Sequence, residues 1–281
     1  MKTNEPINIL FAGNEKVFNG MIITLLSIVK HTKCPIHAYC LTMDLTDVNE
    51  KFIPISEKQR AFLEKILTDA NKESSLKLLD LSDLFRKEMI NSVNLQNHFT
   101  PYSMLRLFAD LLPEIPDKII YLDTDTVINN DLRKLYDIDI KDYELGAVTD
   151  IYNWASPSRW FKKFYFNAGV LLLNMKKIKE TGMFVKTRYL CLNKKMMYMD
   201  QDALNNSAKL VKKLPVIFNS KDKYYPEIVV HHFCNVREGK VKFIGKWWHR
   251  IKPWEVDFVK QKMTAYNDIL DKYLKLKESF K

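Results

Sequence analysis

Glycine is scarce in this chain: its 281 residues include only seven glycines, and no two of them form a G-x-G. Soluble proteins contain about 7% glycine, roughly three times as much. The glycine-rich phosphate-binding loops of dinucleotide-binding folds and P-loop proteins are therefore absent. If the protein binds a phosphorylated ligand, other groups must offset the negative charge.

Cysteine motifs and long apolar runs are missing as well. The four cysteines form no C-x-x-C and no metal-ligand spacing, which favours reduced thiols in a cytoplasmic protein. The opening stretch MKTNEPINIL lacks the apolar core and the small-residue cleavage site of a signal peptide. The most apolar run, residues 21–29, is far shorter than the ~20 residues that span a bilayer. We expect a soluble cytoplasmic protein, at most peripheral at the inner face of the membrane.

Positive charge is in excess, with 44 Lys and Arg against 34 Asp and Glu, and this favours anionic partners. The excess is largest after residue 238, where lysines are interleaved with Trp247, Trp248 and Trp254. We therefore expect a main domain at residues 1–238 and a basic, aromatic C-terminal segment at 239–281. That segment either meets an anionic membrane or packs on the main domain as a helix with a solvated basic side. No nucleic-acid-binding motif is present, so nucleic acid is not an expected partner.

Strand and helix patterns alternate along the main domain. Ser56 and Gln59 form a capping box at the start of a helix, and Thr100 with Pro101 opens another. In a helix at 20–31, Thr24, Ser27 and Lys30 recur every three residues and predict a narrow solvated stripe. Alternation at this spacing predicts an α/β fold with a Rossmann-like, mostly parallel sheet flanked by helices. The expected strands are residues 7–13, 36–42, 75–82, 118–122, 145–150, 167–175 and 214–219.

Two acids follow the strand at 118–122. Asp123 and Asp125 should lie at the carboxyl end of the sheet, where ligands bind in open α/β folds. Neighbouring carboxylates repel each other unless a cation is shared, and no Arg or Lys is close in the sequence. A divalent metal, Mg²⁺ or Mn²⁺, is the natural partner, although the acids could instead cap the following turn. The similar pair Asp137 and Asp139 lies among other charges and is expected in a solvated loop.

A histidine pair ends another β-branched run. Neighbouring strand residues point to opposite faces, so only one of His231 and His232 can reach the acids. A histidine ligand favours Mn²⁺ over Mg²⁺. A buried histidine with a purely structural role is the alternative, and His249 is a rival for the ligand position.

Five motifs occur in a fixed order after the first strand: YLDTDTVINNDL, FNAGVLLLNM, MDQDALNN, HHF and KPW. In this order the chain closely resembles glycosyltransferase family 8, which includes bacterial lipooligosaccharide galactosyltransferases and glycogenin. The resemblance runs from residue 7 to about residue 254. It implies a GT-A fold, a UDP-sugar donor bound with Mn²⁺, and transfer with retention of anomeric configuration.

The resemblance also implies roles for individual residues. His232 matches the third metal ligand beside Asp123 and Asp125, and Lys252 matches a lysine on the diphosphate. Arg106 matches an arginine near the donor sugar and phosphate, with an ordinary exposed helix arginine as its alternative. The amide Gln201 is a poor nucleophile, so attack on the face that the diphosphate leaves is favoured over a covalent intermediate. The other positions implied to contact the donor or the reacting carbon are Thr124, Asp150, Asn167 and Asp200.

The segment that should hold the uracil departs from the family pattern. The usual acid and Asn-Tyr pair are replaced in FAGNEKVF, where the matching positions include Ala12, Asn14, Lys16 and Val17. This departure removes the expected stacking ring at Val17, and the alternative is that Phe18, one place further on, replaces it by a small shift. We expect the transfer of galactose or glucose from a UDP-sugar to a glycan or glycolipid of cell-surface polysaccharide or lipooligosaccharide synthesis. A catalytically silent nucleotide-sugar-binding protein is the alternative.

Overall fold

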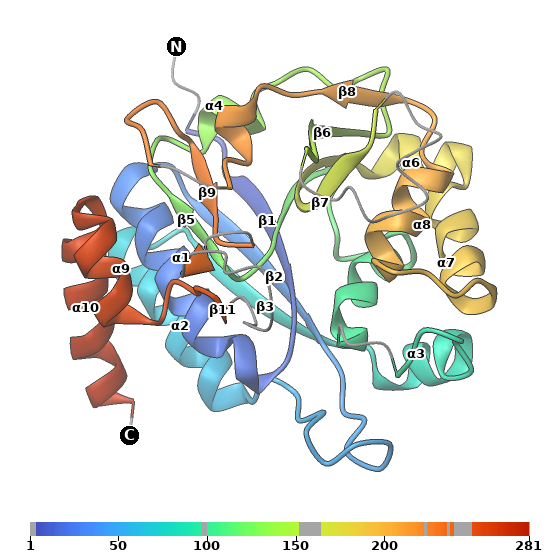
Figure 1. Ribbon diagram of the computed structural model, residues 1–281, viewed down its shortest axis with the longest axis horizontal. Helices are drawn as coiled ribbons and strands as arrows, with labels where there is room; N and C mark the ends of the chain where they lie inside the picture. The colour runs from blue at the N-terminus through green and yellow to red at the C-terminus, as the bar shows by residue number, and fades with distance from the viewer. Residues whose placement is uncertain are drawn as a thin grey trace, which may run out of the picture.

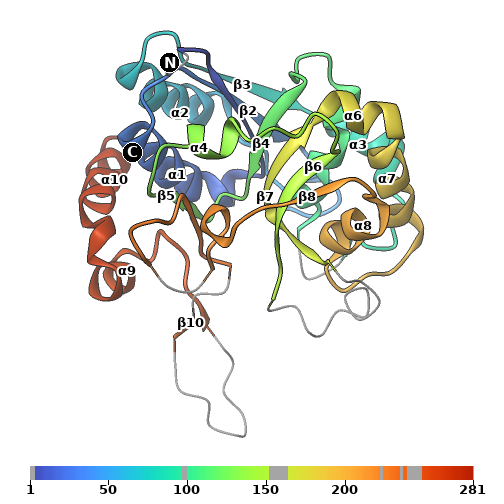
Figure 2. The same ribbon diagram turned by 90° about the horizontal axis from the view of Figure 1, so that it is seen from above.

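The computed structural model describes residues 4–96, 100–151, 164–221, 224–234, 237–238 and 249–280, with 237–238 and 249–250 described by their backbone alone. A seven-stranded sheet crosses the molecule, and helices cover both of its faces (Figure 1 and Figure 2). Within this sheet, ordered β3-β2-β1-β4-β7-β6-β8, β7 runs antiparallel to the others, so the predicted α/β class is confirmed. The strands are β1 (Ile7–Ala12), β2 (Ile36–Thr42), β3 (Ser75–Asp80), β4 (Lys118–Leu122), β6 (Leu145–Thr149), β7 (Phe166–Asn174) and β8 (Val211–Lys213).

Helices form a layer on each face of the sheet (Figure 2). The first layer contains α1 (Phe18–His31), α2 (Glu57–Ala70), α9 (Val256–Lys262) and α10 (Asn267–Ser279). The second contains α3 (Ser82–Met89), the 3-10 helix η2 (Pro101–Leu111), α6 (Met175–Thr181), α7 (Met183–Asn193) and α8 (Met199–Ser207). Shorter elements are η1 (Glu15–Val17), α4 (Arg133–Tyr136), η3 (Val216–Phe218) and η4 (Thr264–Tyr266).

An apolar core fills the space on each side of the sheet. In β1, Ile9 and Phe11 point into the core beneath α1 and α2, while Leu10 points into the core beneath η2 and α7. Side chains alternate along a strand, and a sheet covered on both faces therefore needs apolar residues at every position. This explains the continuous apolar runs in the sequence. Burying each such side chain contributes about 1.5–3 kcal/mol relative to exposure.

The polar residues of α1 do not form the predicted solvated stripe. Thr24 and Ser27 are fully buried, and of the three stripe residues Lys30 alone reaches solvent. Thr24 Oγ1 donates to the carbonyl oxygen of Thr126 at 2.7 Å, and Ser27 Oγ accepts from the backbone N–H of Ile128 at 2.9 Å. The polar residues do recur every three positions along α1. However, the hydroxyl groups of Thr24 and Ser27 bond to the backbone of a strand rather than to water. These bonds tie α1 to the segment that follows the acid pair.

A small antiparallel sheet brings the histidine to the acids. Strand β5 (Thr126–Ile128) pairs with β9 (Val230–His232), and Thr126 is directly opposite His232 (Figure 1). Because β5 begins one residue after Asp125, this pairing places the histidine beside the acid pair. The two segments are more than a hundred residues apart in the sequence and meet through strand pairing.

Three predicted elements differ from the structure. Residues 214–219, predicted as a strand, contain η3, and the strand β8 lies immediately before them. Pro215 has no N–H to donate to a ladder, which favours ending the strand there. Thr100 occupies the N-cap position, but its side chain makes no capping bond and the helix is of the 3-10 type. The single closing helix expected in the C-terminal segment is divided into α9 and α10 by η4.

The C-terminal segment is described in part. Helix α10 packs on α1, burying Ile269, Leu270 and Tyr273. Two short strands, β10 (Arg237–Glu238) and β11 (His249–Arg250), pair antiparallel. Trp247 and Trp248 lie outside the described residues, and the domain boundary after residue 238 stays a prediction. Among the described residues, no helix is both long and apolar enough to cross a bilayer.

Candidate active site

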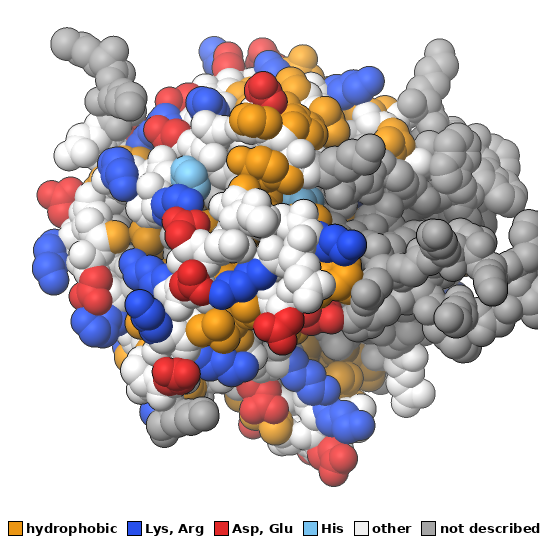
Figure 3. All heavy atoms as spheres, turned by 60° about the vertical axis from the view of Figure 1, so that its left-hand side comes forward, with side chains coloured by type: hydrophobic (Ala, Val, Ile, Leu, Met, Phe, Trp, Pro, Cys, Tyr) orange, Lys and Arg blue, Asp and Glu red, His pale blue; other side chains and the backbone are white. Residues whose placement is uncertain are grey.

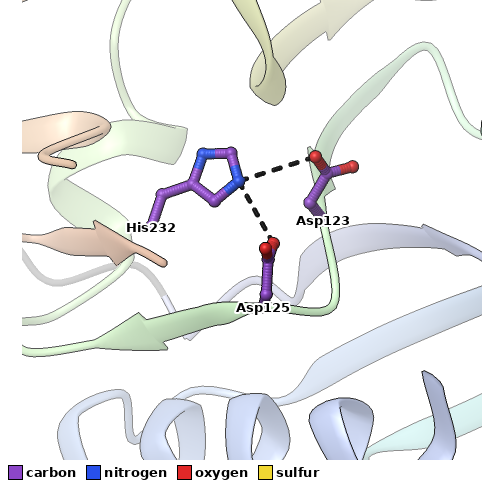
Figure 4. A group of neighbouring side chains, drawn as sticks. All are labelled: Asp123, Asp125 and His232. Atoms are coloured by element: carbon purple, nitrogen blue, oxygen red, sulfur yellow. Dashed lines mark ion pairs between the residues drawn. The ribbon is translucent and has the colours of Figure 1, made fainter. Parts of the chain in front are cut away.

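Two carboxylates and one histidine converge beyond the end of β4 (Figure 4). His232 Nε2 lies 3.1 Å from Asp125 Oδ1 and 3.6 Å from Asp123 Oδ2. One ligand atom from each of the three side chains lies within 4.8 Å of the others. Asp125 and His232 are buried, and Asp123 is half-buried. The structure therefore brings together the three residues expected to bind a metal.

The neighbouring histidine points to the other side of β9. His231 Nδ1 lies 2.6 Å from the hydroxyl of Tyr266, and its ring packs against Phe233. Burial, and then the charge of His232, lower the pKa of His231 to about 4. The predicted alternation of the pair is thus found, with His232 facing the acids. The side chain of His249, the rival ligand, lies outside the described residues.

The residues of this cluster fit a divalent cation. His232 Nε2 is buried and has no aligned hydrogen-bond partner within the described part of the chain, although Asp125 is close. Gly169 faces the cluster: a Cβ there would lie 2.1 Å from His232 Cε1 and 2.6 Å from Asp123 Oδ2. Two carboxylates and an imidazole form a donor set that Mn²⁺ and related ions accept. A buried nitrogen without an aligned hydrogen-bond partner, close to two carboxylates, fits a metal ligand.

The turn that carries the acids is clamped from two sides. The buried Thr124 lies between the acids, and a Cβ on Gly20 of α1 would lie 2.2 Å from its carbonyl oxygen. Thr126 Oγ1 donates to the carbonyl oxygen of Asp123 at 2.9 Å. Glycine is required at position 20 for this close approach, and the approach fixes the turn against α1.

Two cations flank the acid pair, whereas the sequence suggested that none was near. An Arg106 side-chain nitrogen lies 3.1 Å from Asp123 Oδ1, and Lys252 Nζ bonds to Asp125 Oδ2. The arginine is 17 residues away in the sequence and the lysine 127 residues away. The charge of the acids is thereby partly compensated, so carboxylate repulsion alone does not establish a metal site. The convergence with His232 is the stronger argument.

Electrostatics keep the buried acid ionised. Burial by itself would raise the pKa of Asp125, but Lys252 and His232 outweigh it and hold that pKa well below its usual range. Burial would lower the pKa of Lys252, and Asp125 raises it instead. Burial would also lower the pKa of His232, which Cys234 and Asp125 raise to about 10. Metal binding would therefore have to displace a proton from this histidine.

Arg106 bridges two groups of acids. It is 3% exposed, so the alternative of an exposed helix arginine is wrong. Besides the contact with Asp123, a guanidinium nitrogen of Arg106 lies 3.3 Å from Asp200 Oδ2, and its Cζ atom lies 3.7 Å from the ring centre of Tyr121. Burial and the nearby Asp123 raise the pKa of Asp200, against the opposing effect of Arg106. The arginine thus holds the metal-site acid and the α8 acid at a fixed separation.

An amide cluster lies between β7 and α8. Asn167 Nδ2 donates to Gln201 Oε1 at 2.9 Å, and Gln201 Nε2 donates to Asp150 Oδ2 at 3.1 Å. Asp150 Oδ1 in turn lies 2.7 Å from Lys221 Nζ. All four side chains are buried. The structure therefore groups the residues expected beside the donor sugar.

The expected base-binding stretch has mixed exposure. Ala12 and Asn14 are buried, Val17 is half-buried, and Lys16 is exposed. Asn14 Nδ2 donates to a backbone carbonyl oxygen of a neighbouring loop at 3.3 Å. The ring of Phe18 packs against two other phenylalanine rings of the core, at centroid distances of 4.8 and 5.9 Å. Phe18 is therefore committed to the core, and the alternative that it replaces the missing aromatic is wrong.

The other two Asp-x-Asp sequences have different surroundings. Asp137 and Asp139 are exposed, in agreement with a solvated loop. Asp202 accepts hydrogen bonds from the hydroxyl of Tyr165 at 2.7 Å and from the N–H of Tyr198 at 3.0 Å. The second bond satisfies a donor at the start of α8, a structural role.

Sequence reasoning missed three residues of this site. Gly169 lies in the FNAGVLLLNM motif, but nothing in the sequence shows that a side chain there would meet the metal cluster. Asn219 lies in a stretch that was predicted to be a strand. Lys221 carried no signal, because its partner Asp150 is 71 residues away. A buried asparagine at the end of an apolar run was the clue to Asn219, since buried amides need partners.

Comparisons with known proteins agree with this geometry. A family model described as glycosyl transferase family 8 matches residues 8–273. A putative glycosyltransferase of Haemophilus influenzae is 26% identical over 278 residues, covering 88% of this chain and 74% of that protein. A glycogenin of Komagataella phaffii is 32% identical over 108 residues, covering 38% of this chain and 20% of the glycogenin.

The fold is also found in solved structures of other proteins. A solved structure of the galactosyltransferase LgtC, in complex with donor and acceptor sugar analogues, superposes with a TM-score of 0.64. The two sequences are 21% identical, and the match covers 97% of this chain and 96% of that one. At this identity the likeness concerns the fold, which is of the predicted GT-A type.

Proposed function

This chain belongs to glycosyl transferase family 8, and from that premise we propose that it is a retaining, metal-dependent hexosyltransferase. It moves galactose or glucose from a UDP-sugar to a glycan or glycolipid acceptor. The observation that carries the proposal is the convergence of Asp123, Asp125 and His232 from two distant segments. In a glycosyltransferase with a diphosphate leaving group and no glycine-rich loop, such a site would supply compensation of the negative charge.

The metal would be held by the two acids and the histidine. When bound, it would supply Lewis-acid stabilisation to the negative charge that develops on the departing diphosphate. We propose Mn²⁺, with Mg²⁺ as a substitute, because the nitrogen ligand favours Mn²⁺. The same family premise supports UDP as the nucleotide, although the stretch around Val17 offers no aromatic ring for the base.

Lys252 and Arg106 support the leaving group in different ways. The side chain of Lys252 is half-exposed beside Asp125. Its ammonium group can therefore leave the Asp125 carboxylate and bind a diphosphate oxygen instead. Arg106 is buried and holds Asp123 and Asp200 in place, so its role is to orient the acids. In the proposed arrangement, both cations would lie near the diphosphate and oppose the negative charge that develops on it.

The amide cluster favours retention without a covalent intermediate. Gln201 Oε1 accepts from the backbone N–H of Ala168 at 3.0 Å and from Asn167, so the oxygen is held in a fixed direction. An amide is a poor nucleophile. We propose that Gln201, Asn167 and Asp150 position the donor sugar, and that the acceptor attacks on the face that the diphosphate leaves.

The acceptor and the location are proposed from the family alone. From membership of the family we propose that the acceptor is a cell-surface polysaccharide or lipooligosaccharide precursor in the cytoplasm. On the face that carries α9 and α10, acidic and basic side chains are interspersed (Figure 3). Two of the lysines there pair with acids: Lys260 with Asp271, and Lys30 with Asp268. This favours a solvated helix face over a uniformly basic membrane-binding one.

Calorimetry with UDP tests the proposal. We expect binding in Mn²⁺ that disappears in EDTA, followed by slow hydrolysis of UDP-galactose or UDP-glucose in the same sample. Asp123→Ala and Asp125→Ala should each abolish the metal-dependent binding, while the exposed Asp137→Ala serves as the matched control. Binding without hydrolysis would favour the catalytically silent alternative. Unchanged Mn²⁺-dependent binding in either site variant would disprove the metal assignment.

The third ligand is tested by a pair of histidine variants. His232→Ala should weaken Mn²⁺ binding by more than His249→Ala does, because His232 contacts both acids. The reverse order would move the ligand position to His249.

A further inference from the structure

Asn219 lies between the metal cluster and the amide cluster. It follows η3, and its side chain is 1% exposed. Its Oδ1 is 3.0 Å from His232 Nδ1, and its Nδ2 is 2.9 Å from Asn167 Oδ1. One short side chain thus contacts both groups of functional residues.

Backbone donors of β7 determine which end of each amide is oxygen. The N–H of Gly169 points at Asn167 at 3.0 Å, so the atom it meets must be the carbonyl oxygen Oδ1. The Asn219 atom that faces this oxygen must then be the NH₂ nitrogen. The other end of Asn219, which faces His232, is therefore an acceptor. No choice of amide orientation is left open, because a backbone N–H is always a donor.

The orientation of Asn219 selects one form of the histidine. An acceptor at 3.0 Å requires a hydrogen on His232 Nδ1. A neutral imidazole with a hydrogen on Nδ1 carries its lone pair on Nε2. Nε2 is the atom that faces Asp123 and Asp125. Metal-ligating histidines commonly donate their second ring N–H in this way, and the bond fixes the orientation of the ring.

The same chain of hydrogen bonds continues from Asn219 through Asn167 to the amide cluster. Asn167 uses its Nδ2 to donate to Gln201 Oε1 at 2.9 Å and to Asp150 Oδ2 at 3.3 Å. The N–H of Ala168 fixes Gln201 Oε1 as an oxygen. A change at Asn219 therefore reaches both the imidazole and Gln201.

We propose that Asn219 is a positioning residue that presents His232 Nε2 to the metal and sets the direction of the Asn167 and Gln201 amides. Its Oδ1 accepts a hydrogen bond from His232 at the metal site, and its Nδ2 donates one to Asn167 beside the proposed position of the sugar. The inference rests on the proposed function for the identity of the metal and the donor. The arrangement of donors and acceptors that supports it is independent of both.

Two substitutions separate the two ends of the side chain. Asn219→Ala removes both bonds, and the affinity for Mn²⁺ alone, measured by electron paramagnetic resonance, should fall by about 10- to 100-fold. Asn219→Asp keeps an acceptor for His232 Nδ1 but cannot donate to Asn167 Oδ1. It should therefore retain Mn²⁺ binding, while kcat for UDP-galactose hydrolysis falls by about tenfold to a hundredfold with KM little changed.

Asn94→Ala is the matched control. Asn94 is equally buried and bonds to the carbonyl oxygens of Cys191 and Lys194, outside the two clusters. The Asn94→Ala variant should lose thermal stability as Asn219→Ala does. Its Mn²⁺ affinity and its rate of donor hydrolysis should stay those of the wild type.

The outcomes distinguish this inference from the proposed function. If Asn219→Ala binds Mn²⁺ like the wild type, or if Asn94→Ala weakens binding equally, Asn219 has no positioning role and the enzyme assignment stands. If the wild type binds Mn²⁺ but hydrolyses no donor, the enzymatic function fails, and the Mn²⁺ affinities still decide the role of Asn219. If the wild type binds no Mn²⁺, both the metal assignment and this inference are wrong.

Discussion

Replacing Gly169 by alanine should disrupt the metal site with little effect on the fold. Its backbone is not in the left-handed region, so alanine is acceptable to the chain itself. The added Cβ would lie 2.1 Å from His232 Cε1, where ordinary contacts begin near 3.4 Å. The histidine or the strand must therefore shift by 3.4 − 2.1 = 1.3 Å. His232 cannot retreat freely, because β9 is paired with β5 and its Nδ1 is bonded to Asn219.

A shift of this size is large for a metal site, where ligand distances are held to about 0.2 Å. We expect the affinity for Mn²⁺ to fall by at least about tenfold to a hundredfold, which is roughly 1.4–2.7 kcal/mol. Overpacking should cost about 1–3 kcal/mol of folding free energy, or a Tm lower by roughly 2–6 °C. The loss of binding should thus exceed what a small loss of stability can explain.

The assay is Mn²⁺ binding by electron paramagnetic resonance at a temperature well below the Tm of the variant. Gly146→Ala is the control, since a Cβ there would meet the mobile end of Leu214 at 3.2–3.4 Å. Wild-type Mn²⁺ affinity in Gly169→Ala would refute the reasoning. Equal losses in both glycine variants would indicate a general effect on the fold.

The remaining predictions concern thiols, an acidic group and a buried ion pair. Burial raises the pKa of Cys40 to about 12 and also raises that of Cys191, so both should resist alkylation at pH 8 in native protein, as mass spectrometry can show. Burial opposes ionisation of Glu64, but bonds from an arginine and a backbone N–H lower its pKa; Glu64→Gln should cost a few tenths of a kcal/mol at pH 7. That stability is present above the unfolded-state pKa and is lost as pH falls through the folded-state value, so the difference in urea unfolding should shrink as the pH is lowered through that range. Lys221→Met removes the lysine whose Nζ lies 2.7 Å from the buried Asp150 Oδ1, and it should lower the free energy of unfolding measured by the same method.

Local pattern was enough to predict most of the strands and helices and to single out the acid pair. After Lys118 the run at 118–122 is buried at every position because β4 is covered on both faces, and the acids followed where such a strand leaves the core. Strand alternation predicted that only one of His231 and His232 could reach the acids, and the family resemblance selected His232. The capping box at Ser56 and Gln59 was found as predicted, since it depends on residues three apart. Family resemblance then assigned roles that spacing alone had left open.

What the sequence by itself determined is the order of strands and helices and the types of residue available to the site. The tertiary structure decided the partner of each polar group. The spacing of Thr24 and Ser27 fits a solvated stripe and a buried contact equally well. In the fold α1 packs against β5, and both hydroxyl groups bond to the backbone of that strand. Lys252 reached Asp125 across 127 residues, and Asn219 reached His232 through the pairing of separate segments. Periodicity reports which face of an element is apolar, whereas hydrogen bonds and ion pairs act over about 3 Å and depend on which segments the fold brings together.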